Sequence, residues 1–206
     1  MIQNSMHITK QQLKIGELEM VILFEGITLP VEERFISISV PEDKINRIKE
    51  IIPKIIEKKM EEPHHRVDSG NEYKRFYTGF LGEAAIEQLF DVEFIDWSVG
   101  KSSFYHVADL KSLGLDVGIK SVEYGKFPII NKHIKRPEII IIKNSDTNVS
   151  LCGLASMSVL SRYQNSDLIL SDSLRSRGTK TAFYGFKFLI GFNNIEELKE
   201  IVNYNH

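Results

Sequence analysis

Several features that commit a protein to a particular class are scarce in this sequence. Cys152 is the one cysteine among 206 residues, so no internal disulfide can form and secreted, disulfide-stapled folds are excluded. No apolar run approaches the roughly 20 residues that a membrane helix requires. The polar segment MIQNSMHITK at residues 1–10 is unlike a signal peptide. We therefore expect a cytoplasmic protein with no membrane partner.

Neither sign of charge dominates the chain. It contains 26 Lys and Arg against 28 Asp and Glu, for a formal net charge of −2, so any site for a polyanion must be local. Glycine-rich phosphate loops of the Walker or dinucleotide type are absent, which argues against a nucleotide-driven enzyme. Cys152 has no histidine signal nearby, so a cysteine hydrolase lacks support.

Changes in apolar spacing divide the N-terminal part of the chain. Residues 17–40 are rich in β-branched and aromatic residues and are broken at Gly26 and Pro30, which predicts a β-hairpin. The next segment has apolar residues at helical spacing and predicts a helix kinked at Pro53. Residues 61–71 are polar and indicate a connection. We expect an N-terminal appendage of hairpin and helix over residues 1–61, and a main fold over residues 73–206.

The main fold is predicted to be α/β, with a mixed β-sheet flanked by helices. A helix begins at Tyr73, and Glu83 and Glu87 lie near the border of its apolar stripe. A terminal helix over residues 194–202 has Asn194 as its N-cap. The expected strands are residues 91–97, 106–111, 117–123, 138–143 and 149–154, followed by a short helix at 156–163 and a strand-like aromatic segment at 181–192.

Chemistry-bearing residues are concentrated in HVADLKSLGLDVGIKSVE, residues 106–123. If residues 112–114 form a turn between two strands, Asp109 and Lys120 become near neighbours on adjoining strands. Asp116 shares a strand face with Lys120 but lies roughly 13 Å away, at about 3.3 Å per residue. Asp116 can therefore join the site only if the hairpin bends or bulges.

This pattern resembles the PD-(D/E)XK nuclease superfamily, which has an acid on one strand and acid-any-lysine on the next. Ala108-Asp109 stands where the family has proline-aspartate, and Gly118-Ile119-Lys120 stands where it has acid-any-lysine. Gly79-Phe80-Leu81-Gly82-Glu83 is similar to the upstream Gly-Glu of many members, whose glutamate supplements a metal site. The resemblance covers about residues 73–154 and implies a restriction-endonuclease-like mixed sheet.

The sequence departs from the family at Gly118, where the second metal-binding carboxylate is missing. Asp116, Glu83 or the off-face Glu123 could replace it, and the residues alone do not choose among them. A catalytically inactive DNA-binding or phage-structural protein on the same scaffold is the alternative that this departure favours.

The resemblance implies metal-dependent hydrolysis of DNA by a small restriction-like or phage-encoded endonuclease. Asp109 would be the principal ligand of Mg²⁺ or Mn²⁺, with Glu83 and Asp116 as supporting acids. Lys120 would orient the attacking water or stabilise the developing negative charge. Cutting both strands with one active site per chain favours a homodimer.

The C-terminal third has a local excess of basic residues. Residues 162–187 contain five Lys and Arg against two Asp. Arg175, Arg177, Lys180 and Tyr184 lie in SLRSRGTKTAFYGF, whose charges and hydroxyl donors are typical of contacts to phosphates. We expect these four residues to hold the DNA backbone beside the cleavage site. A second, weaker basic stretch covers residues 126–136.

A reading outside nucleic-acid chemistry also stays open. An α/β protein that binds a small molecule or another protein would show no affinity for DNA at low salt, whereas a DNA-binding protein would lose its affinity steeply as salt rises.

Overall fold

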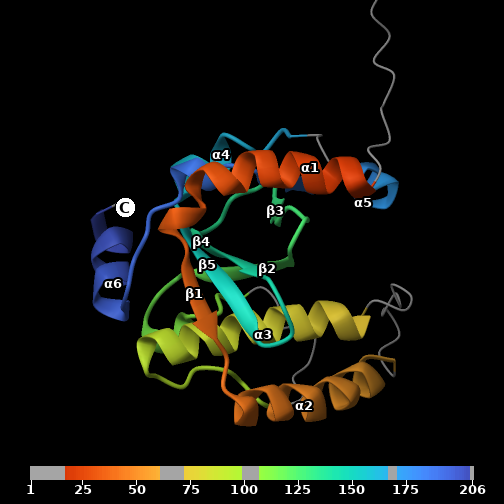
Figure 1. Ribbon diagram of the computed structural model, residues 1–206, viewed down its shortest axis with the longest axis vertical. Coiled ribbons are helices and arrows are strands. Elements are labelled where there is room, and N and C mark those ends of the chain that lie inside the picture. Colours follow the sequence, from red (N-terminus) through yellow and green to blue (C-terminus); the bar gives the residue numbers. More distant parts are fainter. Residues whose placement is uncertain (1–16, 61–71, 99–106, 167–170, 205–206) are drawn as a thin grey trace, which may run out of the picture.

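The structure is a computed structural model that describes residues 17–60, 72–98, 107–166 and 171–204. Helices flank a four-stranded mixed sheet, as the α/β prediction requires (Figure 1). The strand order is β1 (Ile36–Ser39), β5 (Asn148–Ala155), β4 (Glu138–Lys143) and β2 (Gly118–Glu123). β2 and β4 are parallel, whereas β5 is antiparallel to both β4 and β1. β3 (Ile129–Asn131) and β6 (Lys180–Ala182) form a separate antiparallel ribbon.

Helices cover both faces of the sheet. α3 lies on one face with α2 outside it, and α1 crosses the opposite face (Figure 1). The α-helices are α1 (Glu17–Thr28), α2 (Glu42–Met60), α3 (Glu72–Phe90), α4 (Met157–Ser161), α5 (Asp172–Arg177) and α6 (Ile195–Tyr204). Short 3-10 helices are η1 (Leu29–Arg34), η3 (Lys111–Leu113) and η4 (Phe186–Phe188). Within the described ranges, no helix combines the length and apolar character that a membrane crossing would need.

β4 explains why the sequence contains four consecutive isoleucines. Ile139 and Ile141 point into the core shared with α2 and α3, whereas Ile140 and Ile142 point into the core beneath α1. Successive side chains of a strand face opposite sides, so a strand covered on both faces is apolar throughout. The charged residue that begins this strand, Glu138, therefore lies in an unusually apolar setting.

The expected N-terminal β-hairpin is wrong, because residues 17–28 form α1. Phe24 and Thr28 are buried, and Met20, Leu23 and Ile27 pack beside them. This is the i, i+3, i+4, i+7 spacing of one helix face. Burial of that face outweighs the strand propensity of the β-branched residues, since propensity is only a weak prior.

The remainder of the expected N-terminal part contributes to the same sheet and cores. The predicted helix with an internal Pro53 is confirmed as α2. β1 pairs with β5 from Ile36 opposite Leu151 to Ser39 opposite Asn148. The chain segment before residue 61 therefore supplies one edge of the sheet as well as α1 and α2.

The strand expected at residues 91–97 is wrong. The buried Glu87 carboxylate of α3 accepts hydrogen bonds from the backbone N–H groups of Phe94 at 2.7 Å and Ile95 at 2.8 Å, and from Lys44 Nζ at 2.6 Å. Backbone groups that a strand would pair with another strand are satisfied here by a side chain, so the segment follows α3 as irregular chain.

The expected strand at 106–111 is also wrong where the structure describes it, since residues 107–111 form turns and enter η3; His106 lies outside the described residues. In the segment 181–192 the strand ends at Ala182. The predicted strands at 117–123, 138–143 and 149–154 are confirmed as β2, β4 and β5. The terminal helix is confirmed with its cap, because Asn194 Oδ1 accepts from the Glu197 N–H at 2.9 Å.

Candidate active site

Asp109 lies in a tight loop that returns the chain to β2. Leu110 N–H donates to the Val117 carbonyl at 3.2 Å, which closes the loop. Asp109 Oδ2 accepts from the Ile119 N–H at 2.5 Å. The preceding N–H, of Gly118, donates to the Pro137 carbonyl at 3.1 Å on the β4 side, so the Ile119 N–H faces the open edge of β2. The Asp109 carboxylate is thereby fixed against that edge.

The Glu138 carboxylate lies beside Gly118. The two residues are directly paired in the parallel register of β2 and β4. A Cβ built at Gly118 would lie 2.1 Å from Glu138 Oε2, so the glutamate side chain occupies the space in which a side chain at position 118 would begin. Lys120 Nζ lies 3.9 Å from Glu138 Oε2. Glu138 Oε2 is buried, and no group of the described residues donates a hydrogen bond to it.

Glu83 reaches the same region from α3. A Cβ at the preceding residue, Gly82, would lie 1.8 Å from Ser121 Oγ of β2, so only glycine allows the helix to pack this closely. Asp109 and Lys120 are both near enough to Glu83 to influence its titration. The close contact of α3 with β2 is therefore what brings a third carboxylate toward Asp109.

All three carboxyl groups titrate above their usual range. Burial, followed by the charges of Asp109 and Glu87, raises the pKa of Glu83 to about 8, while Lys120 opposes the shift. Burial also raises the pKa of Glu138 to about 7, and Asp109 adds to the shift against the opposing charge of Lys120. The pKa of Asp109 is raised by burial of its carboxylate, against the Ile119 hydrogen bond and Lys120. Burial is the largest cause of the shift in all three groups, and Lys120 opposes the shift in each.

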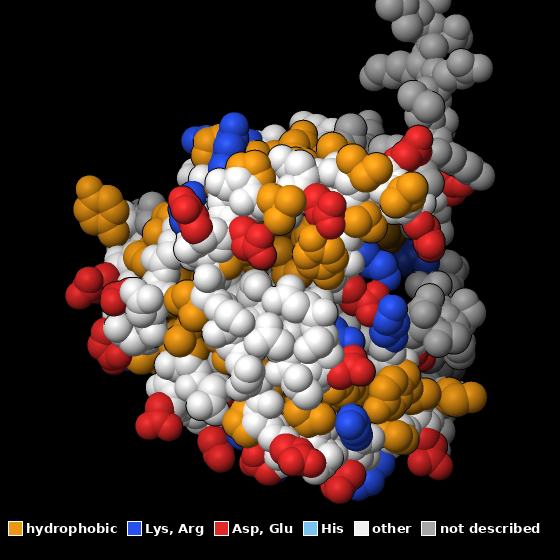
Figure 2. Space-filling view, viewed as in Figure 1, with side chains coloured by type: hydrophobic (Ala, Val, Ile, Leu, Met, Phe, Trp, Pro, Cys, Tyr) orange, Lys and Arg blue, Asp and Glu red, His pale blue; other side chains and the backbone are white. Residues whose placement is uncertain are grey.

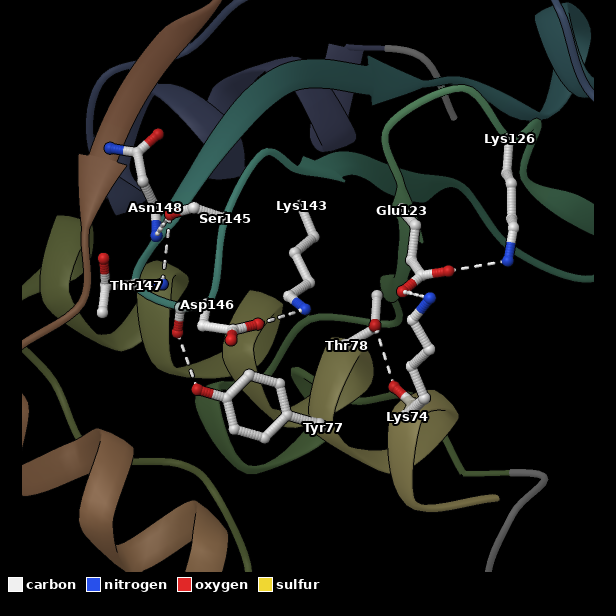
Figure 3. Close-up of polar contacts among 10 residues, drawn as sticks. All are labelled: Lys74, Tyr77, Thr78, Glu123, Lys126, Lys143, Ser145, Asp146, Thr147 and Asn148. Carbon is white, nitrogen blue, oxygen red and sulfur yellow. Dashed lines mark hydrogen bonds and ion pairs between the residues drawn. The ribbon is translucent and has the colours of Figure 1, made fainter. Parts of the chain in front are cut away.

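The other acids that the sequence offered lie at the margin of this site. Asp116 Oδ1 is 3.6 Å from Arg136 Nη1, and the Asp116 side chain is 58% exposed. Its charge influences Glu138 but is not among the groups that shift Asp109. Glu123, at the other end of β2, is held by Lys74 and Lys126 (Figure 3).

Some of the expected DNA contacts lie beside the carboxylates. The pKa of Lys180 is lowered by partial burial and by the positive charges of Lys120, Arg177 and Arg75. We call these four residues, which come from β6, β2, α5 and α3, the cation cluster. In the part of the chain that the structure describes, neither Lys180 nor Arg177 forms an ion pair with an acidic side chain.

The two remaining residues of the expected DNA contact lie differently. Arg175 is partly buried on α5. Tyr184 is partly buried and packs edge-on against Tyr163, with ring centroids 4.6 Å apart. Tyr184 therefore belongs to the packing beneath α1.

The donor set suits a hard divalent cation that shares its ligands with a substrate. Among the described residues, no group of three or more His, Cys, Asp or Glu side chains is placed so that it could hold a metal ion. Mg²⁺ is usually bound through one or two carboxylates, with waters and substrate phosphates completing its shell. Asp109 and Glu138 are two carboxylates of this kind, and Glu138 Oε2 accepts no hydrogen bond from the described residues, with Lys120 Nζ 3.9 Å away.

Glu138 is the site residue that sequence reasoning missed. Its signal was a single glutamate between Pro137 and four consecutive isoleucines, because a charge at the start of a fully buried strand needs a partner or a function. Comparison with known proteins adds no assignment: no family model, curated protein or solved structure matches this chain.

Proposed function

We propose that the protein is a divalent-metal-dependent endonuclease that hydrolyses phosphodiester bonds of DNA. The observation that carries the proposal is the placement of Glu138 in the space that a side chain at Gly118 would fill, next to Lys120. The acid that the motif lacks in sequence is thus supplied from the neighbouring strand. Asp109, the acid that precedes the motif, is anchored to the same short stretch of β2.

Each side chain has a role that follows from its charge and position. Asp109 and Glu138 would hold Mg²⁺ or Mn²⁺, with Glu83 as a supporting acid. The bound cation would activate a water and polarise the phosphoryl oxygen. Lys120 carries a compact positive charge beside Glu138 and would stabilise negative charge as it develops on the phosphate.

The cation cluster supports a polyanionic substrate. Lys180 and Arg177 would neutralise backbone phosphates next to the cleaved bond, which is the sequence-independent part of nucleic-acid binding. Within the cluster, Arg75 pairs with Glu72 and Lys120 lies near Glu138. The positive charges of Lys180 and Arg177 repel one another, and a bound phosphate backbone would reduce that repulsion.

Cleavage of supercoiled plasmid in Mg²⁺ or Mn²⁺ tests the proposal. We expect the wild type to nick or linearise the plasmid, EDTA to stop the reaction, and Lys120→Met to abolish it. Lys54→Met changes an exposed lysine of α2 and should cleave as the wild type does. Mg²⁺ should also raise the melting temperature of the wild type, because a ligand that binds only the folded state stabilises it, and Asp109→Asn should remove that rise.

The alternative is a catalytically inactive DNA-binding protein on the same scaffold. It predicts DNA binding that weakens with salt, no cleavage in either metal, and no effect of Mg²⁺ on melting. That set of results would overturn the enzyme proposal.

A further inference from the structure

A groove of about 1000 Å³ lies beyond the carboxyl ends of β2 and β4. It opens below α1 on the right side of the molecule, where basic and acidic side chains lie close together (Figure 2). Its apolar side is lined by Met20 and Val21 of α1, by Leu174 of α5, and by Phe127. This volume is at the upper end of the roughly 300 to 1000 Å³ of small-ligand sites, so it suits one or two nucleotides and not a duplex.

The charged side chains that line the groove balance overall, since Lys74, Lys126 and Lys143 stand against Glu17, Glu123 and Asp146, but lysines outnumber acids where α3 meets β2. Glu123 is held between Lys74 Nζ at 2.8 Å and Lys126 Nζ at 2.6 Å (Figure 3). Two ammonium groups thus face one carboxylate. Each ammonium has three donors, and the Lys74 and Lys126 side chains are 56% and 64% exposed. Both lysines can therefore bind a phosphate without releasing Glu123.

The neighbouring wall is a rigid turn between β4 and β5. Lys143 Nζ pairs with Asp146 Oδ1 at 2.7 Å, and the Tyr77 hydroxyl donates to the Asp146 carbonyl at 2.6 Å (Figure 3). Ser145 Oγ accepts from the Asn148 N–H at 3.1 Å. These contacts hold this side of the groove in one shape before any ligand arrives.

Tyr124 provides an aromatic surface at the groove. The residue lines the groove and is 44% exposed. Its hydroxyl donates to Glu25 Oε1 at 2.8 Å, and its ring meets Phe24 at an angle of 69° with centroids 5.2 Å apart. The ring is held at both ends, so a base could stack on it at little cost in side-chain entropy.

The groove lies near the candidate active site along α3. Glu123 follows Lys120 by three residues on β2, about 10 Å at roughly 3.3 Å per residue, and the two side chains leave opposite faces of the strand. Lys74 directly precedes Arg75 of the cation cluster on α3. A strand of nucleic acid that passes the cation cluster would therefore reach the groove within one or two nucleotides.

From these features we propose that the groove binds a single strand of nucleic acid adjoining the cleaved bond, with a base stacked on Tyr124 and a phosphate held by Lys126 and Lys74. Exposed lysines beside an exposed aromatic ring are the chemistry by which proteins hold unpaired strands. The inference deepens the proposed function and rests on it for the identity of the neighbouring site.

Binding of a short fluorescent oligothymidylate, measured by anisotropy at low salt in EDTA, tests the groove without any cleavage. Tyr124→Ala should weaken binding roughly 5- to 100-fold, the range expected for loss of one base–aromatic stack. Tyr124→Phe keeps the ring and should bind within about twofold of the wild type. Lys126→Gln should lower the salt dependence of binding by about one phosphate contact.

Tyr204→Ala is the matched control, since Tyr204 is 91% exposed on α6. Equal affinity of the Tyr124→Ala and Tyr204→Ala variants, or an equal loss by Tyr124→Ala for a duplex of the same length, would overturn the inference. Binding that depends on Tyr124 without plasmid cleavage would remove the proposed enzyme and keep the groove. If the protein cleaves plasmid but the Tyr124 and Lys126 variants bind the oligonucleotide as the wild type does, the proposed enzyme stands and the groove proposal is overturned.

Discussion

The carboxylates beside the two ends of β2 lie in opposite electrostatic environments. At the carboxyl end, Glu123 contacts two lysines within 2.8 Å, and the pKa of its carboxyl is held below the usual range by these partners. Beside the amino end, Lys120 Nζ lies 3.9 Å from Glu138 Oε2 at the start of β4, and burial raises the pKa of Glu138 to about 7. Glu123 of β2 therefore has two close basic partners, whereas Glu138 of the neighbouring strand has a more distant one.

This difference indicates which end is shaped by folding alone. A paired surface carboxylate changes the free energy of unfolding little in either direction. A buried carboxyl oxygen without a hydrogen bond, by contrast, destabilises the fold. Strain of this kind concentrates at sites where a ligand relieves it. The amino end of β2 is thus the better candidate for metal chemistry, and the carboxyl end for substrate contact.

The largest expected effect comes from moving the carboxylate between strands. Glu138→Gly should lower the cleavage rate at least about 100-fold, because it removes a metal ligand. Gly118→Glu alone should also impair cleavage, since its Cβ would lie 2.1 Å from Glu138 Oε2. The double variant returns a single carboxylate to the same space and should recover a large part of the rate, measured by plasmid cleavage.

Recovery in the double variant is the informative result. If the cleavage rate of the double variant fell by the product of the two factors measured for the single variants, then Glu138 would not replace the acid missing at Gly118.

A smaller effect is expected midway along β2, where α3 touches the strand. Gly82→Ala would place a Cβ 1.8 Å from Ser121 Oγ and 3.0 Å from Ser121 Cβ, and should destabilise the fold by about 2 kcal/mol through overpacking. Gly79→Ala on the same helix meets no atom within 4 Å and should stabilise it by about 0.5 to 1 kcal/mol. Urea unfolding measures both, and changes of the same sign would contradict the close contact.

Local sequence reasoning could find the parts of the site that are near in the chain. The closeness of Asp109 and Lys120 follows from the length of one loop, even though Asp109 lies in a turn and not on the expected strand. Glu83 could be placed because Gly82-Glu83 is similar to the Gly-Glu pair upstream of the nuclease motif. Glu138 could not, since its position beside Gly118 depends on the parallel register of two strands about 20 residues apart.

The errors in the fold have the same origin. α1 was misread because β-branched residues outweighed a helical spacing that its buried face displays. The segment 91–97 was misread because its N–H groups bond to the Glu87 side chain, a tertiary contact that no local pattern contains. The sequence predicts β2, β4 and β5 because apolar residues fill most of each strand and polar turns bound it.

A pH series sets the two ends of β2 against each other. The folded pKa of Glu138 is about 7 against an ordinary value of 4.5, so between these values the folded state holds a proton that the unfolded chain has released. The free energy of unfolding therefore falls as pH rises through this window. Glu138→Gln removes that fall and should match the wild type below about pH 4 but exceed it by up to about 3 kcal/mol at pH 8 in EDTA, since each pKa unit corresponds to about 1.4 kcal/mol.

Glu123→Gln is the matched change with the opposite sign. The pKa of Glu123 is lowered in the fold, so its stabilisation is present above the ordinary pKa and is lost as pH falls through the folded value. At pH 8 this variant should be less stable than the wild type by up to about 1 kcal/mol, because its lysine partners are exposed, and added salt should reduce the difference. Thermal unfolding would resolve both changes, since each kcal/mol shifts the melting temperature by about 2 to 4 °C. A destabilised Glu138→Gln at pH 8 would mean that its carboxylate is as well satisfied as that of Glu123, and the contrast between the two ends would be lost.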